Sequence, residues 1–209
     1  MPELQFYRYF LGFRPDASAR RLLAAAGKKA GQAGKRVPDD LLHLTLCVVR
    51  EAGGRERDRF VLRRVEAALA GHTLAAMPIP LGRVIGGRHG ALARTIGRQD
   101  AIQGFYGALA RLLRARGIEP LHRKSGLHPH VTLGHDPCDF PPLRVEIEWV
   151  PRELLLIESE VGLTRQNVLG TWPLLPPRQP LLPFGEPFPA PHIGGRPIAA
   201  TNPARRSAA

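Results

Sequence analysis

The chain has 209 residues, of which 44% are hydrophobic, and its formal net charge at pH 7 is +12. This length allows one large domain or two small lobes, each with a hydrophobic core. No run approaches the roughly 18 apolar residues of a membrane helix, so we expect no membrane partner. The positive charge favours a polyanionic partner, although a basic, solvated surface would give the same value.

The N-terminal sequence and the cysteines predict a cytoplasmic protein. Residues 1–6 lack the basic start and the apolar stretch of a secretory signal peptide. Cys47 and Cys138 lie far apart in the sequence and match no metal-binding spacing. We therefore expect the protein to occupy the reducing cytoplasm.

In chain order, the hydrophobic pattern predicts a mixture of strands and helices from residue 5 to residue 175. The predicted strands are residues 5–13, 43–49, 78–85, 91–96, 130–133, 143–150, 153–160 and 171–175. The predicted helices are residues 17–30, 55–70 and 99–116, with Asp16 as a cap of the first and Phe60 on the buried face of the second. This order predicts an α+β fold with two pseudo-symmetric lobes of mainly antiparallel sheet, helices on the outer faces and a central cleft.

The chain is expected to divide into a folded domain at residues 1–175 and a tail at residues 176–209. From Pro176 onward the sequence is rich in proline and has almost no periodic apolar pattern. Such a composition does not bury enough apolar surface to offset the entropy cost of folding. We therefore predict that the tail is disordered.

One short pattern occurs twice, as His-Leu-Thr-Leu at residues 43–46 and as His-Val-Thr-Leu at residues 130–133. In a strand, alternate side chains point to opposite faces. Each copy then presents a histidine and a threonine on one face, His43 with Thr45 and His130 with Thr132, above apolar packing. Two such strands supply a general base, a general acid and two hydroxyl donors, a set that suits phosphoryl chemistry. The alternative is that each histidine is a half-buried strand residue with a local hydrogen-bond partner.

Basic and aromatic residues near the two motifs are weaker candidates. Arg123 and Lys124, ahead of the second motif, are candidates for contact with a phosphate or an RNA backbone, and the alternative is a solvated loop. Tyr9 or Phe10 on the first strand is a candidate for stacking on a base, although a core position is the more common role of such a residue.

Histidines beside the second motif raise the question of a metal site. His128, His130 and His135 lie close together in the sequence, but their spacing matches no zinc signature. We therefore expect no metal and no cofactor.

Several segments together resemble the two-histidine (2H) phosphoesterase superfamily, and within it the bacterial RNA 2′,3′-cyclic phosphodiesterases, also called 2′-5′ RNA ligases. The segments are the two motifs, residues 8–16 (RYFLGFRPD), residues 37–46 (VPDDLLHLTL), and residues 154–160 (LLLIESE) followed by residues 172–174 (WPL). The resemblance covers residues 4–175. It departs from the common pattern at Gly134-His135, where a small residue and an arginine are usual, and near residues 166–168, where a tyrosine is missing. These departures concern the substrate, not the two-histidine chemistry.

The resemblance implies that His43 and His130 are catalytic and flank a phosphodiester without a metal. Thr45 and Thr132 would hold the non-bridging phosphate oxygens. The implied substrate is RNA or a nucleotide with a 2′,3′-cyclic phosphate, hydrolysed to a phosphomonoester by a monomeric enzyme, with 2′-5′ ligation as the reverse reaction. Which histidine is the acid and which the base stays open.

Two other functions are compatible with the sequence. One is a related phosphodiesterase that acts on a small cyclic nucleotide. The other is an RNA-binding protein whose histidines contact phosphate without catalysis, for which no aromatic-rich RNA-binding motif is visible.

Overall fold

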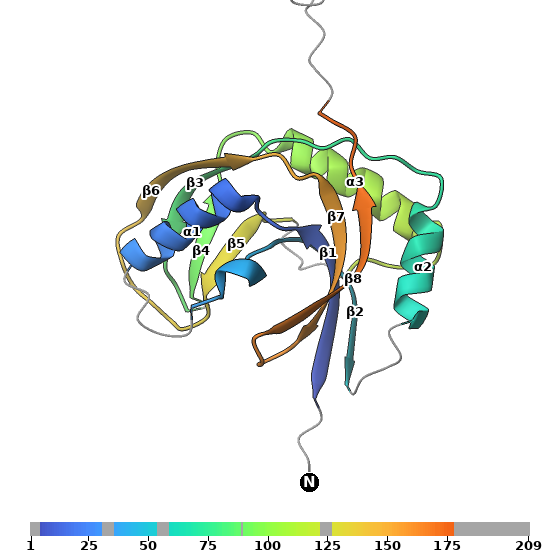
Figure 1. Ribbon diagram of the computed structural model, residues 1–209, viewed down its shortest axis with the longest axis horizontal. Helices are drawn as coiled ribbons and strands as arrows, with labels where there is room; N and C mark the ends of the chain where they lie inside the picture. Colours follow the sequence, from blue (N-terminus) through green and yellow to red (C-terminus); the bar gives the residue numbers. More distant parts are fainter. Residues whose placement is uncertain (1–4, 31–35, 54–58, 89, 122–126, 178–209) are drawn as a thin grey trace, which may run out of the picture. The chain divides into compact units, whose positions relative to one another are not determined.

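The structure is a computed structural model that describes residues 5–30, 36–53, 59–88, 90–121 and 127–177. Its elements in chain order are β1 (Phe6–Phe13), α1 (Ala17–Lys29), the 3₁₀ helix η1 (Asp39–Leu41), β2 (Leu44–Gly53), α2 (Arg59–Leu69), β3 (Ile79–Ile85), β4 (Ala91–Thr95), α3 (Asp100–Arg114), β5 (His130–Gly134), β6 (Leu143–Trp149), β7 (Glu153–Glu160) and β8 (Arg165–Pro173). Figure 1 shows these elements in space. Residues 178–209 lie outside the described part, so the predicted disorder of the tail stays a prediction.

The strands form one sheet in the order β6-β3-β4-β5-β2-β1-β7-β8, and all recorded strand pairs within it are antiparallel. The two middle strands, β5 and β2, share a single recorded pair, Leu44 with Val131. The sheet therefore consists of two four-stranded halves, which we call the β5 half (β6-β3-β4-β5) and the β2 half (β2-β1-β7-β8). The prediction of an α+β fold with two lobes of mainly antiparallel sheet is confirmed, and each motif strand is the inner strand of its half.

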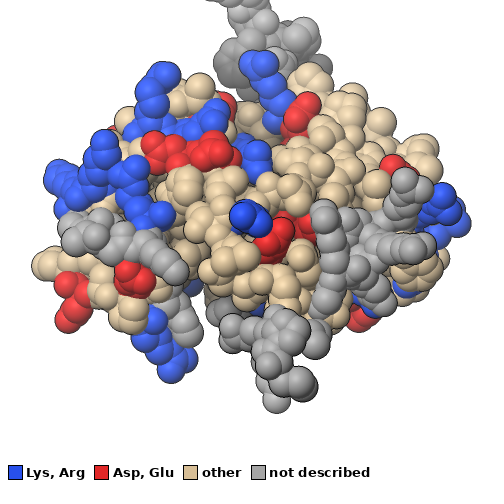
Figure 2. Space-filling view, turned by 60° about the horizontal axis from the view of Figure 1, so that its bottom comes forward, with Lys and Arg blue, Asp and Glu red and all other residues tan. Residues whose placement is uncertain are grey.

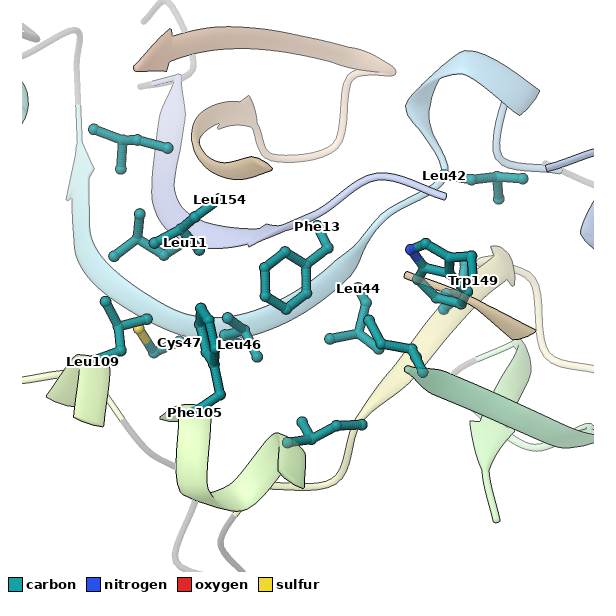
Figure 3. Close-up of a cluster of buried hydrophobic side chains, with 14 of the residues drawn as sticks. Leu11, Phe13, Leu42, Leu44, Leu46, Cys47, Phe105, Leu109, Trp149 and Leu154 are labelled. Carbon is teal, nitrogen blue, oxygen red and sulfur yellow. The ribbon is translucent and has the colours of Figure 1, made fainter. Parts of the chain in front are cut away.

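The three helices cover one face of this sheet. Leu23 of α1, Val65 of α2 and Leu109 of α3 are buried in one cluster together with Leu44 of β2 and Val131 of β5. Figure 1 shows α1 along the β5 half, and α2 and α3 beside the β2 half. In Figure 3, side chains from strands of both halves and from α3 project into the same cluster. We call this the core face, and we call the opposite face, which bears the motif histidines, the site face.

Local signals in the sequence explain where the first helix begins. The Asp16 carboxylate accepts a hydrogen bond from the Ala19 backbone N–H at 2.8 Å, which confirms the predicted N-cap. Lys28 and Lys29 in the last turn interact favourably with the negative end of the helix dipole. This helix packs Leu23 and Ala26 onto the core face of the β5 half.

Two predictions about individual elements are wrong. Strand β8 begins at Arg165 rather than at Thr171, because it is an edge strand whose exposed and half-buried positions do not alternate regularly. Phe60 is 59% exposed instead of lying on the buried face of α2, where Val61 and Val65 are buried. The guanidinium of Arg64 lies over the Phe60 ring, 5.5 Å from its centroid.

No helix in the described part of the chain is long and apolar enough to cross a membrane.

Candidate active site

The β2–β5 pair brings the two motifs together at the centre of the sheet. Leu44 pairs with Val131, and both side chains lie in the core cluster. Since alternate residues point to opposite faces, His43, Thr45, His130 and Thr132 lie on the site face. Continuing the antiparallel register by one residue on each side sets His43 across from Thr132 and Thr45 across from His130. In this arrangement the two histidines are diagonal neighbours, which in a regular antiparallel pair lie about 7–8 Å apart, with their Cβ atoms somewhat closer.

The backbone orients both imidazoles in the same way. The Nδ1 atom of His43 lies 2.8 Å from the Leu41 carbonyl oxygen, and the Nδ1 atom of His130 lies 2.7 Å from the His128 carbonyl oxygen. A carbonyl oxygen only accepts hydrogen bonds, so Nδ1 carries the proton in both rings. In the neutral form of each ring, the lone pair is therefore on Nε2. Both histidines use the carbonyl two residues earlier to select this tautomer.

The surroundings of His43 keep its imidazole neutral. Its ring stacks on Phe10, with the centroids 4.7 Å apart and the planes 28° from parallel. Burial lowers the pKa of His43 from 6.5 to about 4, and the charges of Arg14, His130 and His135 act in the same direction. The hydrogen bond to Leu41 opposes this shift without reversing it. His43 is therefore uncharged at pH 7.

An apolar patch supports His43 on the site face of the β2 half. Phe10 is 2% exposed and packs with Leu155, Ile157 and Val48. Phe10 thus contacts a motif histidine and is not available to stack on a base. Tyr9 is fully buried in the core cluster, and its hydroxyl lies 3.1 Å from Glu158, so the core position is confirmed for Tyr9.

Gln166 is a site residue that the sequence did not identify. Its side-chain Nε2 lies 3.2 Å from Nδ1 of His43, while its Oε1 is buried without a hydrogen-bond partner among the described residues. Because Nδ1 already carries a proton, the amide group beside it must be an acceptor. Turning the amide by 180° places Oε1 beside Nδ1, where it accepts from the same N–H that bonds the Leu41 carbonyl, and places Nε2 at the buried position. The only signal in the sequence is the departure from the family pattern near residues 166–168.

Arg14, which follows β1, supplies a positive charge beside His43. The charge of Arg14 is one cause of the lowered pKa of His43. The Nε of Arg14 is buried and has no hydrogen-bond partner in the described part of the chain. A buried donor of this kind is costly to leave unpaired.

The two threonines present hydroxyl groups beside the imidazoles. Thr45 and Thr132 are half-buried, and neither side chain makes a hydrogen bond with any described residue. Arg123 and Lys124 lie outside the described residues, so their proposed phosphate contacts stay predictions. In the described part of the chain, no three His, Cys, Asp or Glu side chains are grouped so that they could hold a metal.

Positive charge is unevenly distributed over the surface. Figure 2 shows the largest groups of Lys and Arg side chains on the left of the face in view, with acidic side chains beside them.

The fold is that of solved phosphoesterases. E. coli LigT complexed with 3′-AMP superposes with a TM-score of 0.62 at 20% identity over 82% of this chain and 99% of that chain. TT0787 of Thermus thermophilus gives a TM-score of 0.62 at 20% identity over 80% and 97%. A structure described as a phosphoesterase gives 0.61 at 20% identity over 83% and 99%. No protein-family model and no curated protein sequence matches the chain. The resemblance inferred from the sequence is thus confirmed for the fold: this chain folds like E. coli LigT and the phosphoesterases that share its architecture.

Proposed function

We propose that this chain is a 2H phosphoesterase that hydrolyses a terminal RNA 2′,3′-cyclic phosphate to a phosphomonoester, and that an RNA 5′-hydroxyl can replace water and open the same ring in reversible 2′-5′ RNA ligation. The observation that carries the proposal is the pair of imidazoles on adjacent central strands, each held by a carbonyl two residues earlier. In-line displacement at phosphorus requires a base on one side and an acid on the other. Two histidines from two opposed strands meet this requirement.

The surrounding groups fit the charge of the reacting phosphoryl group. Thr45 and Thr132 donate to its non-bridging oxygens, and the Arg14 guanidinium neutralises part of its charge. Hydrogen-bond donors aimed at the positions where negative charge develops stabilise the transition state of such a reaction. LigT, which has this fold, is known in complexes with 3′-AMP, ATP and phosphate, a ligand chemistry compatible with the proposal.

In hydrolysis, His43 takes the proton from the attacking water and His130 gives a proton to the departing ribose oxygen. Stacking on Phe10 and burial hold His43 neutral, as a base must be. A leaving-group experiment tests this division. A nucleoside 4-nitrophenyl phosphodiester needs little proton donation, so it restores turnover to His130→Gln and leaves His43→Gln inactive. The opposite pattern of rescue would reverse the two roles.

The central experiment measures hydrolysis of an oligoribonucleotide with a 2′,3′-cyclic phosphate end, in EDTA, by the wild type and by the variants His43→Gln and His130→Gln. His72→Gln is the matched control, because His72 is exposed just after the end of α2. We expect metal-independent turnover by the wild type and the control, and its loss in both motif variants.

Other outcomes separate the alternatives. Tight RNA binding by the wild type without turnover would indicate a non-catalytic RNA-binding protein. Turnover of small cyclic nucleotides alone would indicate a phosphodiesterase of another substrate class. Turnover that EDTA abolishes would contradict the metal-free mechanism.

A further inference from the structure

Three arginines continue the line of His130 across the β5 half. Strand pairing sets Arg94 of β4 across from His130, Arg83 of β3 across from Arg94, and Arg144 of β6 across from Arg83. Directly paired residues on neighbouring strands point to the same face of a sheet. We call Arg94, Arg83 and Arg144 the arginine row.

The arginine row lies on the site face. Residues that precede or follow these arginines, such as Ala93 and Val84, are buried in the core cluster, so the arginines point the other way. Arg83 and Arg144 are exposed and Arg94 is half-buried. The row therefore begins beside a motif histidine and runs outward along the same surface.

The row is electrostatically unfavourable as it stands. Like charges directly opposite each other on neighbouring strands are destabilising. Among the described residues, no carboxylate lies within salt-bridge distance of Arg94, Arg83 or Arg144. A bound chain of anions would relieve this repulsion.

Neighbouring side chains set the limits of the row. Leu92 and Ile85 form a parallel apolar row that continues from Thr132, through the pairs Leu92 with Thr132 and Ile85 with Leu92. Glu146 and Glu148 share the exposed face of β6 with Arg144, further along that strand. The arginine row is thus flanked by the apolar side chains of Leu92 and Ile85, and the nearest acidic residues on β6 lie further along that strand.

We propose that the arginine row binds the backbone phosphates of a single-stranded RNA whose 3′-terminal cyclic phosphate lies between His43 and His130. This inference rests on the proposed function for the position of the terminal phosphate. A 2′,3′-cyclic phosphate ends its strand, so the remaining nucleotides extend only in the 5′ direction. Neighbouring strands are about 4.8 Å apart, so the three steps from β5 to β6 span about 14 Å, enough to follow more than one phosphate.

The chemistry of the row fits this ligand. A guanidinium donates two parallel hydrogen bonds to a phosphate group, with better geometric match than an ammonium. Leu92 and Ile85 offer apolar contact to sugars and bases, without donors or acceptors that distinguish one base from another. The row therefore favours long substrates over mononucleotides and has little sequence preference.

The kinetic test compares kcat/KM for an oligoribonucleotide and a mononucleotide, both with a 2′,3′-cyclic phosphate, in the wild type and in the variants Arg83→Gln and Arg144→Gln. Arg21→Gln, on an exposed position of α1, is the control with the same loss of charge. We expect kcat/KM for the oligoribonucleotide to fall roughly 5-fold per arginine at low salt, with the mononucleotide unchanged. An equal fall for both substrates, or none for the oligoribonucleotide, would overturn the inference.

A binding test keeps this inference separate from the proposed function. Fluorescence anisotropy measures the Kd of a labelled oligoribonucleotide with a 3′-phosphate at several salt concentrations. Each arginine that contacts a phosphate contributes about 0.7 to the slope of log Kd against log salt, so each variant lowers the slope by that amount. If the wild type binds the RNA with this salt dependence but turns over no substrate, the row stands and the proposed function fails. If the wild type turns over the substrate but the slope is unchanged in the variants, the proposed function stands and the inference about the arginine row fails.

Discussion

The two halves of the sheet hold their motif histidines with the same backbone device but in different surroundings. In the β2 half, His43 lies on an apolar patch that includes Phe10, and burial lowers its pKa to about 4. In the β5 half, His130 lies next to Arg94, the first residue of the arginine row on the site face. The comparison indicates that the backbone sets the tautomer of both histidines, while the neighbouring side chains lower the pKa of His43 and place positive charge beside His130.

The largest effect is expected from removing either histidine. His43→Gln and His130→Gln each lower kcat by about 10²–10⁴, because each removes one proton-transfer group from the same step. The double variant is little slower than the slower single variant, since groups that act as a unit are not additive. Single-turnover hydrolysis measures all three. Multiplied losses in the double variant would show that the two histidines contribute independently rather than as a unit.

The threonines test whether the halves contribute equally to charge stabilisation. Thr45→Val and Thr132→Val keep the side-chain shape and remove one hydroxyl donor each, so each lowers kcat by about 10². The conservative variants Thr45→Ser and Thr132→Ser restore most of the rate. Steady-state kinetics with a cyclic-phosphate substrate provides the measurement. A fall in kcat in only one of the two valine variants would show that the two halves do not contribute equally to charge stabilisation.

The lowered pKa of His43 makes the free energy of unfolding depend on pH. Its folded pKa of about 4 lies below the unfolded value of 6.5, so the unfolded chain binds the proton first as pH falls. Stability from this group is complete above pH 6.5 and decreases by at most about 3 kcal/mol by pH 4. Urea unfolding of the wild type and of His43→Gln at several pH values measures the difference, with His72→Gln as the control. Parallel pH dependence in the wild type and His43→Gln would contradict the assignment.

The smallest effect is expected from Gln166, which positions the ring of His43. Gln166→Leu removes one hydrogen-bond partner, worth about 1 kcal/mol, and lowers kcat/KM roughly 5-fold. Gln166→Glu retains an acceptor and adds a negative charge, which raises the pKa of His43. NMR titration of the His43 ring separates this positioning role from a general loss of stability. An unchanged titration in Gln166→Glu would argue against the contact.

The sequence was sufficient to predict both motif strands, because a period of two over apolar and polar residues is a local signal. It was not sufficient for Gln166 and Arg14, whose positions beside His43 depend on how β8 and β1 lie in the folded sheet. The arginine row was also hidden in the sequence. Arg83 and Arg94 lie side by side only because of the register in which β3 and β4 pair. A register shift in β3 between Leu81 and Arg83 changes which side chains point to the site face.

The single β2–β5 pair has a mechanical consequence. Each half consists of four paired strands, but Leu44 with Val131 is the one strand pair recorded between the halves in the described part of the chain. The separation of His43 and His130 therefore depends on this one strand pair and on the core side chains packed beneath it. A small rotation of one half against the other would change this separation and leave each ring in its own backbone hydrogen bond.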